Sequence, residues 1–199
     1  MIAVLTGDII NSRQGQTSLW LNQLKSTLNL YGQTPKDWEI FRGDSFQLKT
    51  NPENALRIAL HIKAIIKQVK PYDVRIAIGL GEQSYNSKTI SESNGTAFVN
   101  SGEGFESLKK QTLTVVSENK KWDNAINIMI NLALLTANNW SNTVAKVIST
   151  VIENPEKNQN DIALLLGKSQ STISEALKRG GYEEIMQLNA FYKEQILNL

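Results

Sequence analysis

Hydrophobic residues recur with two different periods along the first 137 residues of this chain. Short runs rich in apolar residues predict five strands, at 2–7, 38–41, 46–49, 73–80 and 112–116. The first has the composition of a buried strand, and in 73–80 apolar and other residues alternate. Apolar residues that recur every three or four positions predict four helices between and after them, at 18–31, 51–70, 96–110 and 122–136. The predicted order of elements is therefore β-α-β-β-α-β-α-β-α.

This pattern changes near Asn138, because no strand signal follows it. The remaining residues predict only helices, at 140–153, 158–166, 169–178 and 182–197. We therefore predict two domains, an α/β domain over 1–137 and an all-helical domain over 138–199. The first six elements have the order of a ferredoxin-like core, to which the α/β domain adds further elements.

Residues 159–178 have the spacing of a helix-turn-helix. Ala163 is small enough for two helices to pack closely, and Gly167, four residues later, accepts the left-handed backbone of a tight turn. Ile173 falls on the inner face of the second helix, and three further apolar residues complete a small core: Ile162, Leu166 and Leu177. The segment is predicted to bind DNA, with the second helix in a major groove.

The polar residues of this segment are the predicted DNA contacts: Lys168, Ser169, Gln170, Ser171, Thr172, Ser174, Lys178 and Arg179. Gln170 is the expected base reader, since a glutamine amide can pair bidentately with adenine, while Lys178 and Arg179 are expected to contact phosphates. The alternatives are a helical hairpin that only packs a core, and a three-helix unit that binds a protein.

Composition limits the remaining possibilities. The chain has 199 residues, no cysteine and one histidine, which disfavours disulfides and zinc sites. That histidine, His61, lies in the second predicted helix, and we expect it at the surface or at a boundary rather than as a catalytic base. No apolar run approaches the roughly 20 residues of a membrane span, and no signal peptide is evident at the start, so we expect a cytoplasmic protein. Residues 138–199 carry six basic and seven acidic side chains, so a single tail would attract DNA weakly and a homodimer is expected.

Two aspartates suggest a second site. Asp8 follows the first predicted strand, and Asp44 lies in the hairpin between the second and third. The first and third strands are neighbours in the predicted topology, so the two carboxylates would lie close together, as a Mg²⁺ ion that also binds a nucleotide phosphate requires. The alternative is that Asp8 caps the next segment and that Asp44 only favours the turn.

These landmarks resemble the class III nucleotidyl cyclase fold. The similarity rests on Asp8-Ile9, Gly43-Asp44, and the segments 75–79 and 95–99. The resemblance implies that Asp8 and Asp44 are the metal-binding acids. The purine-selecting lysine of that family falls on Ile40, and its transition-state asparagine and arginine fall on Val99 and Glu103, or on Asn100 and Gly104 after a shift of one residue. The catalytic set is thus incomplete, and ordinary cyclisation is not expected.

A closer resemblance is to the SatD family of small bacterial proteins. It rests on the N-terminal TGDIINS, the RGDSF hairpin, the segment 95–102 and the helix-turn-helix tail. This resemblance implies a cyclase-like domain joined to a DNA-binding domain, and it implies no defined reaction.

Three hypotheses follow. The first is a DNA-binding transcriptional regulator whose N-terminal domain senses a ligand or mediates dimerisation. The second is an enzyme that processes a nucleotide with Mg²⁺ held by Asp8 and Asp44. The third is a protein–protein adaptor.

Overall fold

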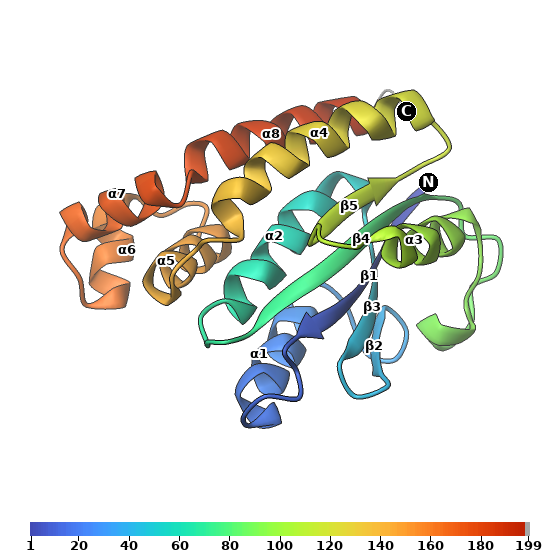
Figure 1. The fold of residues 1–199 in the computed structure, drawn as a ribbon, viewed down its shortest axis with the longest axis horizontal. Helices are drawn as coiled ribbons and strands as arrows, with labels where there is room; N and C mark the ends of the chain where they lie inside the picture. The colour runs from blue at the N-terminus through green and yellow to red at the C-terminus, as the bar shows by residue number, and fades with distance from the viewer. Residues whose placement is uncertain (198–199) are drawn as a thin grey trace.

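A computed structural model describes residues 1–197 of the chain, in which one five-stranded sheet forms the centre of the N-terminal part (Figure 1). The strands run in the order β2-β3-β1-β4-β5. Their bounds are Ile2–Ile10 for β1, Trp38–Phe41 for β2, Ser45–Thr50 for β3, Asp73–Gly81 for β4 and Leu113–Val116 for β5. The pairs β2–β3, β3–β1 and β1–β4 are antiparallel, and β5 runs parallel to β4. The expectation that the first and third strands are neighbours is confirmed.

Side chains of β1 point alternately to the two faces of this sheet, and they pack against different helices on each face. Ala3 and Leu5 belong to the main core, together with α1 (Thr17–Asn29) and α2 (Ala55–Ile66), which follows the short 3₁₀ turn η1 (Pro52–Asn54). Val4 points the other way and packs with Ala97 of α3 (Thr96–Ser107) and with Ile90 of the 3₁₀ turn η2 (Ile90–Glu92). The consecutive apolar residues at the start of β1 therefore reflect a sheet covered on both faces.

Helix α3 lies directly on the backbone of β4. A Cβ atom added at Gly79 would lie 2.2 Å from the carbonyl oxygen of Ala97 and 2.2 Å from the amide nitrogen of Ser101. Only glycine allows this approach without a shift of the helix.

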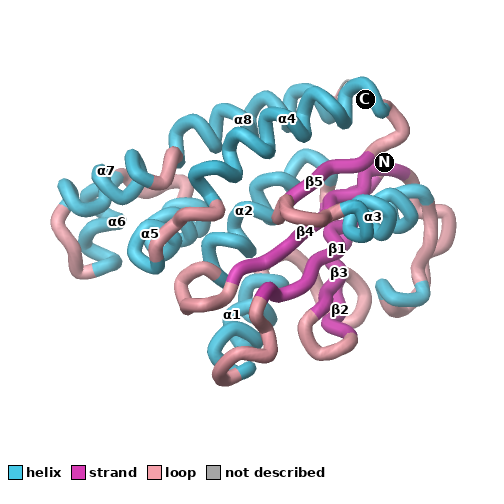
Figure 2. The backbone as a smooth tube through the Cα atoms, viewed as in Figure 1, coloured by secondary structure: helices cyan, strands magenta, loops and turns pink. Residues whose placement is uncertain are grey.

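The C-terminal part contains helices only, as Figure 2 shows. These are α4 (Lys120–Ala137), α5 (Asn142–Glu153), α6 (Gln159–Leu166), α7 (Gln170–Arg179) and α8 (Tyr182–Ile196). The predicted boundary at Asn138 falls in the turn between α4 and α5. One continuous hydrophobic core nevertheless contains residues from both sides of it, and the division into two domains stays a prediction.

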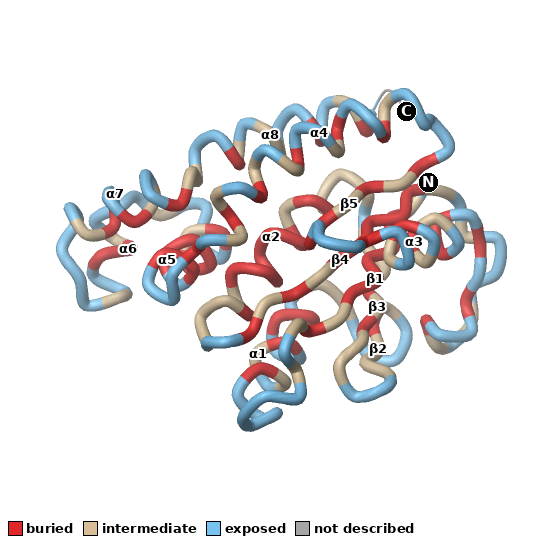
Figure 3. Tube along the Cα trace, in the orientation of Figure 1, coloured by how far each residue is buried: buried red, intermediate tan, exposed pale blue. Residues whose placement is uncertain are grey.

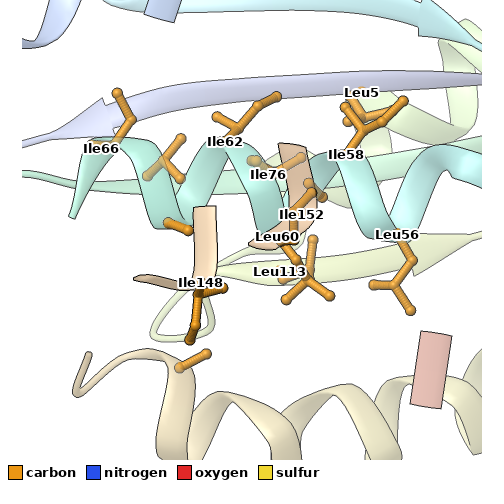
Figure 4. Packing of buried hydrophobic residues seen from close by; sticks show 14 of the residues in the cluster. Leu5, Leu56, Ile58, Leu60, Ile62, Ile66, Ile76, Leu113, Ile148 and Ile152 are labelled. Carbon is orange, nitrogen blue, oxygen red and sulfur yellow. The ribbon is translucent and has the colours of Figure 1, made fainter. Parts of the chain in front are cut away.

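Helix α2 connects the two parts because it is apolar on opposite sides. Figure 4 shows Ile58 and Ile62 on the side of β1, with Leu56 and Leu60 pointing away from that strand. Ile148 and Ile152 of α5 belong to the same core, and α2 packs directly against α5. The helical tail is thus anchored to the sheet through α2.

The sequence predicted the order of the elements, whereas some bounds differ. Strand β1 continues to Ile10, so Asp8 lies inside the strand rather than after it. Its last residues remain paired because both neighbouring strands reach that far, with Asp8 opposite Ser45 and Ile10 opposite Asp73. Within residues 1–197, no helix combines the length and the apolar character that crossing a membrane demands.

Candidate nucleic-acid interface

Helices α6 and α7 meet at a tight turn with a defined backbone. Gly167 adopts the left-handed conformation, with φ 59° and ψ 40°, and the next amide, that of Lys168, donates to the carbonyl of Ala163 at 2.9 Å. This closes α6 in the manner of a helix end that glycine favours. The role expected for Gly167 is therefore present in the structure.

Both helices begin with a side-chain cap. Asn158 and Asp161 form a reciprocal capping box at the start of α6, and the Ser169 hydroxyl accepts from the amide of Thr172 at 3.3 Å at the start of α7. Such caps satisfy amides that have no partner inside the helix. The local sequence thus sets where each helix starts, and hence where the turn lies.

A small core fixes the angle between the two helices. Ile173 is fully buried, Ala163 and Ile162 are buried beside it, and α5 packs beneath both helices. Leu166 and Leu177 are half-buried at the margin of this core. The five apolar positions singled out from the sequence therefore face inward.

The opposite surface of α7 and of the turn is polar and exposed. Seven of the eight predicted DNA contacts are exposed and Thr172 is half-buried: Lys168, Ser169, Gln170, Ser171, Ser174, Lys178 and Arg179 are the exposed ones. Figure 3 shows α6 and α7 largely exposed on their outer side, at the end of the molecule away from the sheet. No other element covers this face within the described part of the chain.

Gln170 has a partner that sequence reasoning missed. Its amide nitrogen donates to the side-chain oxygen of Gln159 at 2.8 Å, and these are the first residues of α7 and α6. The contact fixes one amide against the other while leaving the remaining polar atoms open to solvent. The sequence does contain a hint of this contact, because Gln159, eleven residues before Gln170, is also the first residue of its helix.

The C-terminal end of α7 carries the two predicted phosphate contacts. Arg179 lies 4.0 Å from Glu175 in an exposed pair, which contributes little to stability and leaves the guanidinium available. Lys178 and Arg179 also border a groove of about 640 Å³ between α4 and α8, where Leu132 and Phe191 are partly exposed.

Asp8, by contrast, is engaged by a neighbouring strand. Arg75 of β4 lies directly opposite Asp8 of β1 and donates from Nε to one carboxylate oxygen at 2.9 Å and from Nη2 to the other at 2.5 Å. The Arg75 guanidinium also lies 5.5 Å from the centre of the Phe105 ring. Hydrogen bonding to Asp8 raises the pKa of Arg75 above its ordinary value.

Asp44 lies at the same end of the sheet, since it precedes Ser45, the residue opposite Asp8. One of its carboxylate oxygens accepts from the Ser12 hydroxyl at 2.5 Å. A pocket of about 400 Å³ beside Asp8 is lined by three cations, Arg75, Lys109 and Lys110. A Mg²⁺ ion at Asp8 would have to compete with the bidentate guanidinium, so this geometry fits an ion pair better than a metal site. Metal binding by Asp8 and Asp44 stays a prediction.

The SatD family model matches residues 1–192 of the 199. The chain belongs to the SatD family. The match runs from the start of the sheet into α8, so it covers both the carboxylate end of the sheet and the helices α6 and α7 with the turn between them. A search of curated proteins and a search of solved structures each found nothing similar.

The histidine of this SatD-family chain corrects one expectation from the sequence. His61 was expected at the surface or at a boundary, yet it is fully buried between Tyr31 and Glu153. Burial lowers its pKa, which favours the neutral ring. Its partners lie 30 and 92 residues away, so no local pattern revealed the contact.

Buried charge also occurs beside β4. Lys63 of α2 is almost inaccessible to solvent, and its ammonium donates to Asp73 at 2.8 Å and to Thr112 at 3.2 Å. Burial lowers the pKa of Lys63 to about 8. This group is enclosed and bound to two neighbouring side chains, so we assign it to the attachment of α2 to the sheet.

Proposed function

We propose that this protein is a DNA-binding transcriptional regulator that reads DNA with α7. The observation that carries the proposal is the exposed polar face of α7, held by the left-handed turn at Gly167 and the Ser169 cap over a buried Ile173. A helix held in this way can enter a major groove with its N-terminal side chains against base edges.

The residues have distinct roles in this proposal. Gln170 contacts a base, with Gln159 holding its amide in place, because amides fixed in advance lose less rotational freedom on binding. Ser169, Ser171, Thr172 and Ser174 donate to phosphates or base edges, and Lys168, Lys178 and Arg179 supply positive charge. The small number of cations favours a homodimer, in which two tails bind two half-sites.

A second candidate is a protein–protein adaptor, which one observation favours. Leu164 and Leu165 on α6 are 82% and 55% exposed, and apolar side chains gathered on a surface are typical of protein contacts. A nucleotide-processing enzyme has less support, because the carboxylates of Asp8 and Asp44 already have partners in the protein.

Selection of DNA from a random pool tests the regulator directly, because it detects binding and returns the sequence that is read. We expect an enriched motif, with repeated half-sites if the protein is a dimer. The selected duplex should then bind the full-length chain with a salt-dependent affinity that falls in the Gln170→Ala/Arg179→Ala variant.

The matched control is Lys25→Ala/Gln33→Ala, which removes an exposed cation and an exposed amide far from α7. It should bind like the wild type. If the full-length protein binds no DNA even at low salt, the regulator proposal fails and the adaptor becomes the better hypothesis.

A further inference from the structure

A groove of about 880 Å³ lies where the sheet-bearing part meets the helical tail. Its walls come from α1, α2 and α5, and from the segments that follow α1 and α5. Its size is in the range of small-molecule sites, and its lining exposes more carbon than polar surface. It is separate from the carboxylates of the sheet and from the exposed face of α7.

Two cations line this groove. Arg57 comes from α2 and Lys146 from α5, and neither forms an ion pair within residues 1–197. Glu153 is the one acidic residue that lines the groove, and it already accepts from His61 at 3.0 Å. Two cations and one carboxylate leave one positive charge in excess in the lining, which favours a negatively charged occupant.

A hydrogen-bonded chain of three side chains fixes the edge of the groove. The Glu153 carboxylate can only accept, so a neutral His61 must carry its proton on Nε2 and accept at Nδ1 from the Tyr31 hydroxyl at 2.6 Å. The chain ties the end of α1, the middle of α2 and the end of α5 together. The hydrogen bonds among Tyr31, His61 and Glu153 thus fix the three helices that form the walls of the groove.

Apolar and amide groups complete the lining. Leu30 is 63% exposed, and Ile65 and Ile152 lie deeper. Gln23 also lines the groove, and its side-chain oxygen is inaccessible to solvent and has no hydrogen-bond partner in the described part of the chain.

We propose that this groove binds an amphipathic organic anion, with its charged group between Arg57 and Lys146 and its apolar body against Leu30 and Ile65. Such a ligand would touch α2 and α5 together. Helix α5 also packs against α7, so the ligand would act on the helix that is proposed to read DNA. This last step rests on the proposed function, whereas the site itself does not.

Binding of 1-anilinonaphthalene-8-sulfonate to the full chain tests the site, because the probe joins a sulfonate to an apolar ring system and fluoresces in apolar surroundings. We expect saturable binding that weakens about tenfold or more in Arg57→Ala/Lys146→Ala, since each charged hydrogen bond lost counts for that order of effect. The uncharged analogue N-phenyl-1-naphthylamine should bind more weakly and respond little to the same variant.

Two controls locate the probe. Lys25→Ala removes an exposed cation of α1 outside the groove and should leave binding unchanged, while Leu30→Ser should weaken it. Equal unfolding midpoints of all variants exclude a loss of structure. The proposal is overturned if the sulfonate does not saturate, if the double variant binds it normally, or if binding follows Leu132→Ser in the α4–α8 groove instead.

DNA binding with and without the probe then separates the two proposals. A changed affinity for the selected duplex supports the link through α5. Probe binding in a protein that binds no DNA would leave the groove as a site and overturn the regulator.

Discussion

The carboxylate end of the sheet and the turn between α6 and α7 both carry polar side chains, yet they use them differently. At the sheet, Asp8 and Asp44 are bound by Arg75 and Ser12, which come from other segments of the chain. At the turn, Asn158 and Ser169 satisfy the helix ends locally, and most of the remaining polar groups point into solvent.

This difference separates groups that hold the protein together from groups that are available to a partner. A carboxylate with a bidentate guanidinium gains little from a new ligand, because the ion pair must be broken first. An exposed amide on a capped helix can bind a partner without breaking an ion pair. This contrast supports the proposal that a partner binds at α7, and substitutions in the two regions can test it.

The largest effect is expected on stability, when the buried core beneath the exposed face of α7 loses a side chain. Ile173→Ala removes a fully buried side chain and should lower the free energy of unfolding by about 2–5 kcal/mol, as in other large-to-small core substitutions. Urea unfolding followed by circular dichroism measures the change.

Ser174→Ala is its matched control, because Ser174 is the next residue on α7 and is exposed. That change should stay within about 0.5 kcal/mol. Similar losses in both variants would mean that α7 does not pack over a core of its own.

The next effect concerns DNA rather than stability. Gln170→Ala should weaken binding to the selected sequence by about 1–3 kcal/mol and leave binding to unrelated DNA nearly unchanged, since base contacts specify and phosphate contacts do not. Fluorescence anisotropy with both duplexes at one salt concentration measures the ratio.

Gln159→Ala sharpens the same test. It removes the partner of Gln170 without removing the base reader, so its loss in specificity should be smaller. If the Gln170→Ala protein discriminates between the two duplexes as well as the wild type does, another residue must contact the bases.

The sequence predicts a contact well when the interacting residues lie close together along the chain, and the two regions differ in this respect. The turn was found because Ala163, Gly167 and Ile173 lie within eleven residues, and short-range spacing alone places them. The pairing of Asp8 with Arg75 was missed, because it depends on the register of two strands 67 residues apart. Burial of His61 was missed for the same reason, since α5 supplies one of its partners.

A smaller change is expected at the cap of α7. Ser169→Ala removes the acceptor for the Thr172 amide and should cost about 1 kcal/mol of unfolding free energy, the usual value for a lost N-cap. Ser169→Asp keeps an acceptor and should restore most of it, which chemical denaturation of the three proteins can measure. If alanine and aspartate behave alike, the Ser169 side chain does not cap the helix.

The smallest effect is expected at the carboxylates, where the ion pair competes with metal. Millimolar Mg²⁺ should leave the melting temperature of the wild type unchanged, because both oxygens of Asp8 accept from Arg75. In Arg75→Ala the carboxylate is released beside Asp44, and Mg²⁺ should then stabilise the protein slightly, by no more than about 1 kcal/mol for a pair of this exposure. Adding Asp8→Asn to Arg75→Ala should abolish that stabilisation. A clear Mg²⁺ effect on the wild type, lost in Asp44→Asn, would show that the sheet end is a metal site despite its ion pair, and the contrast with α7 would no longer hold.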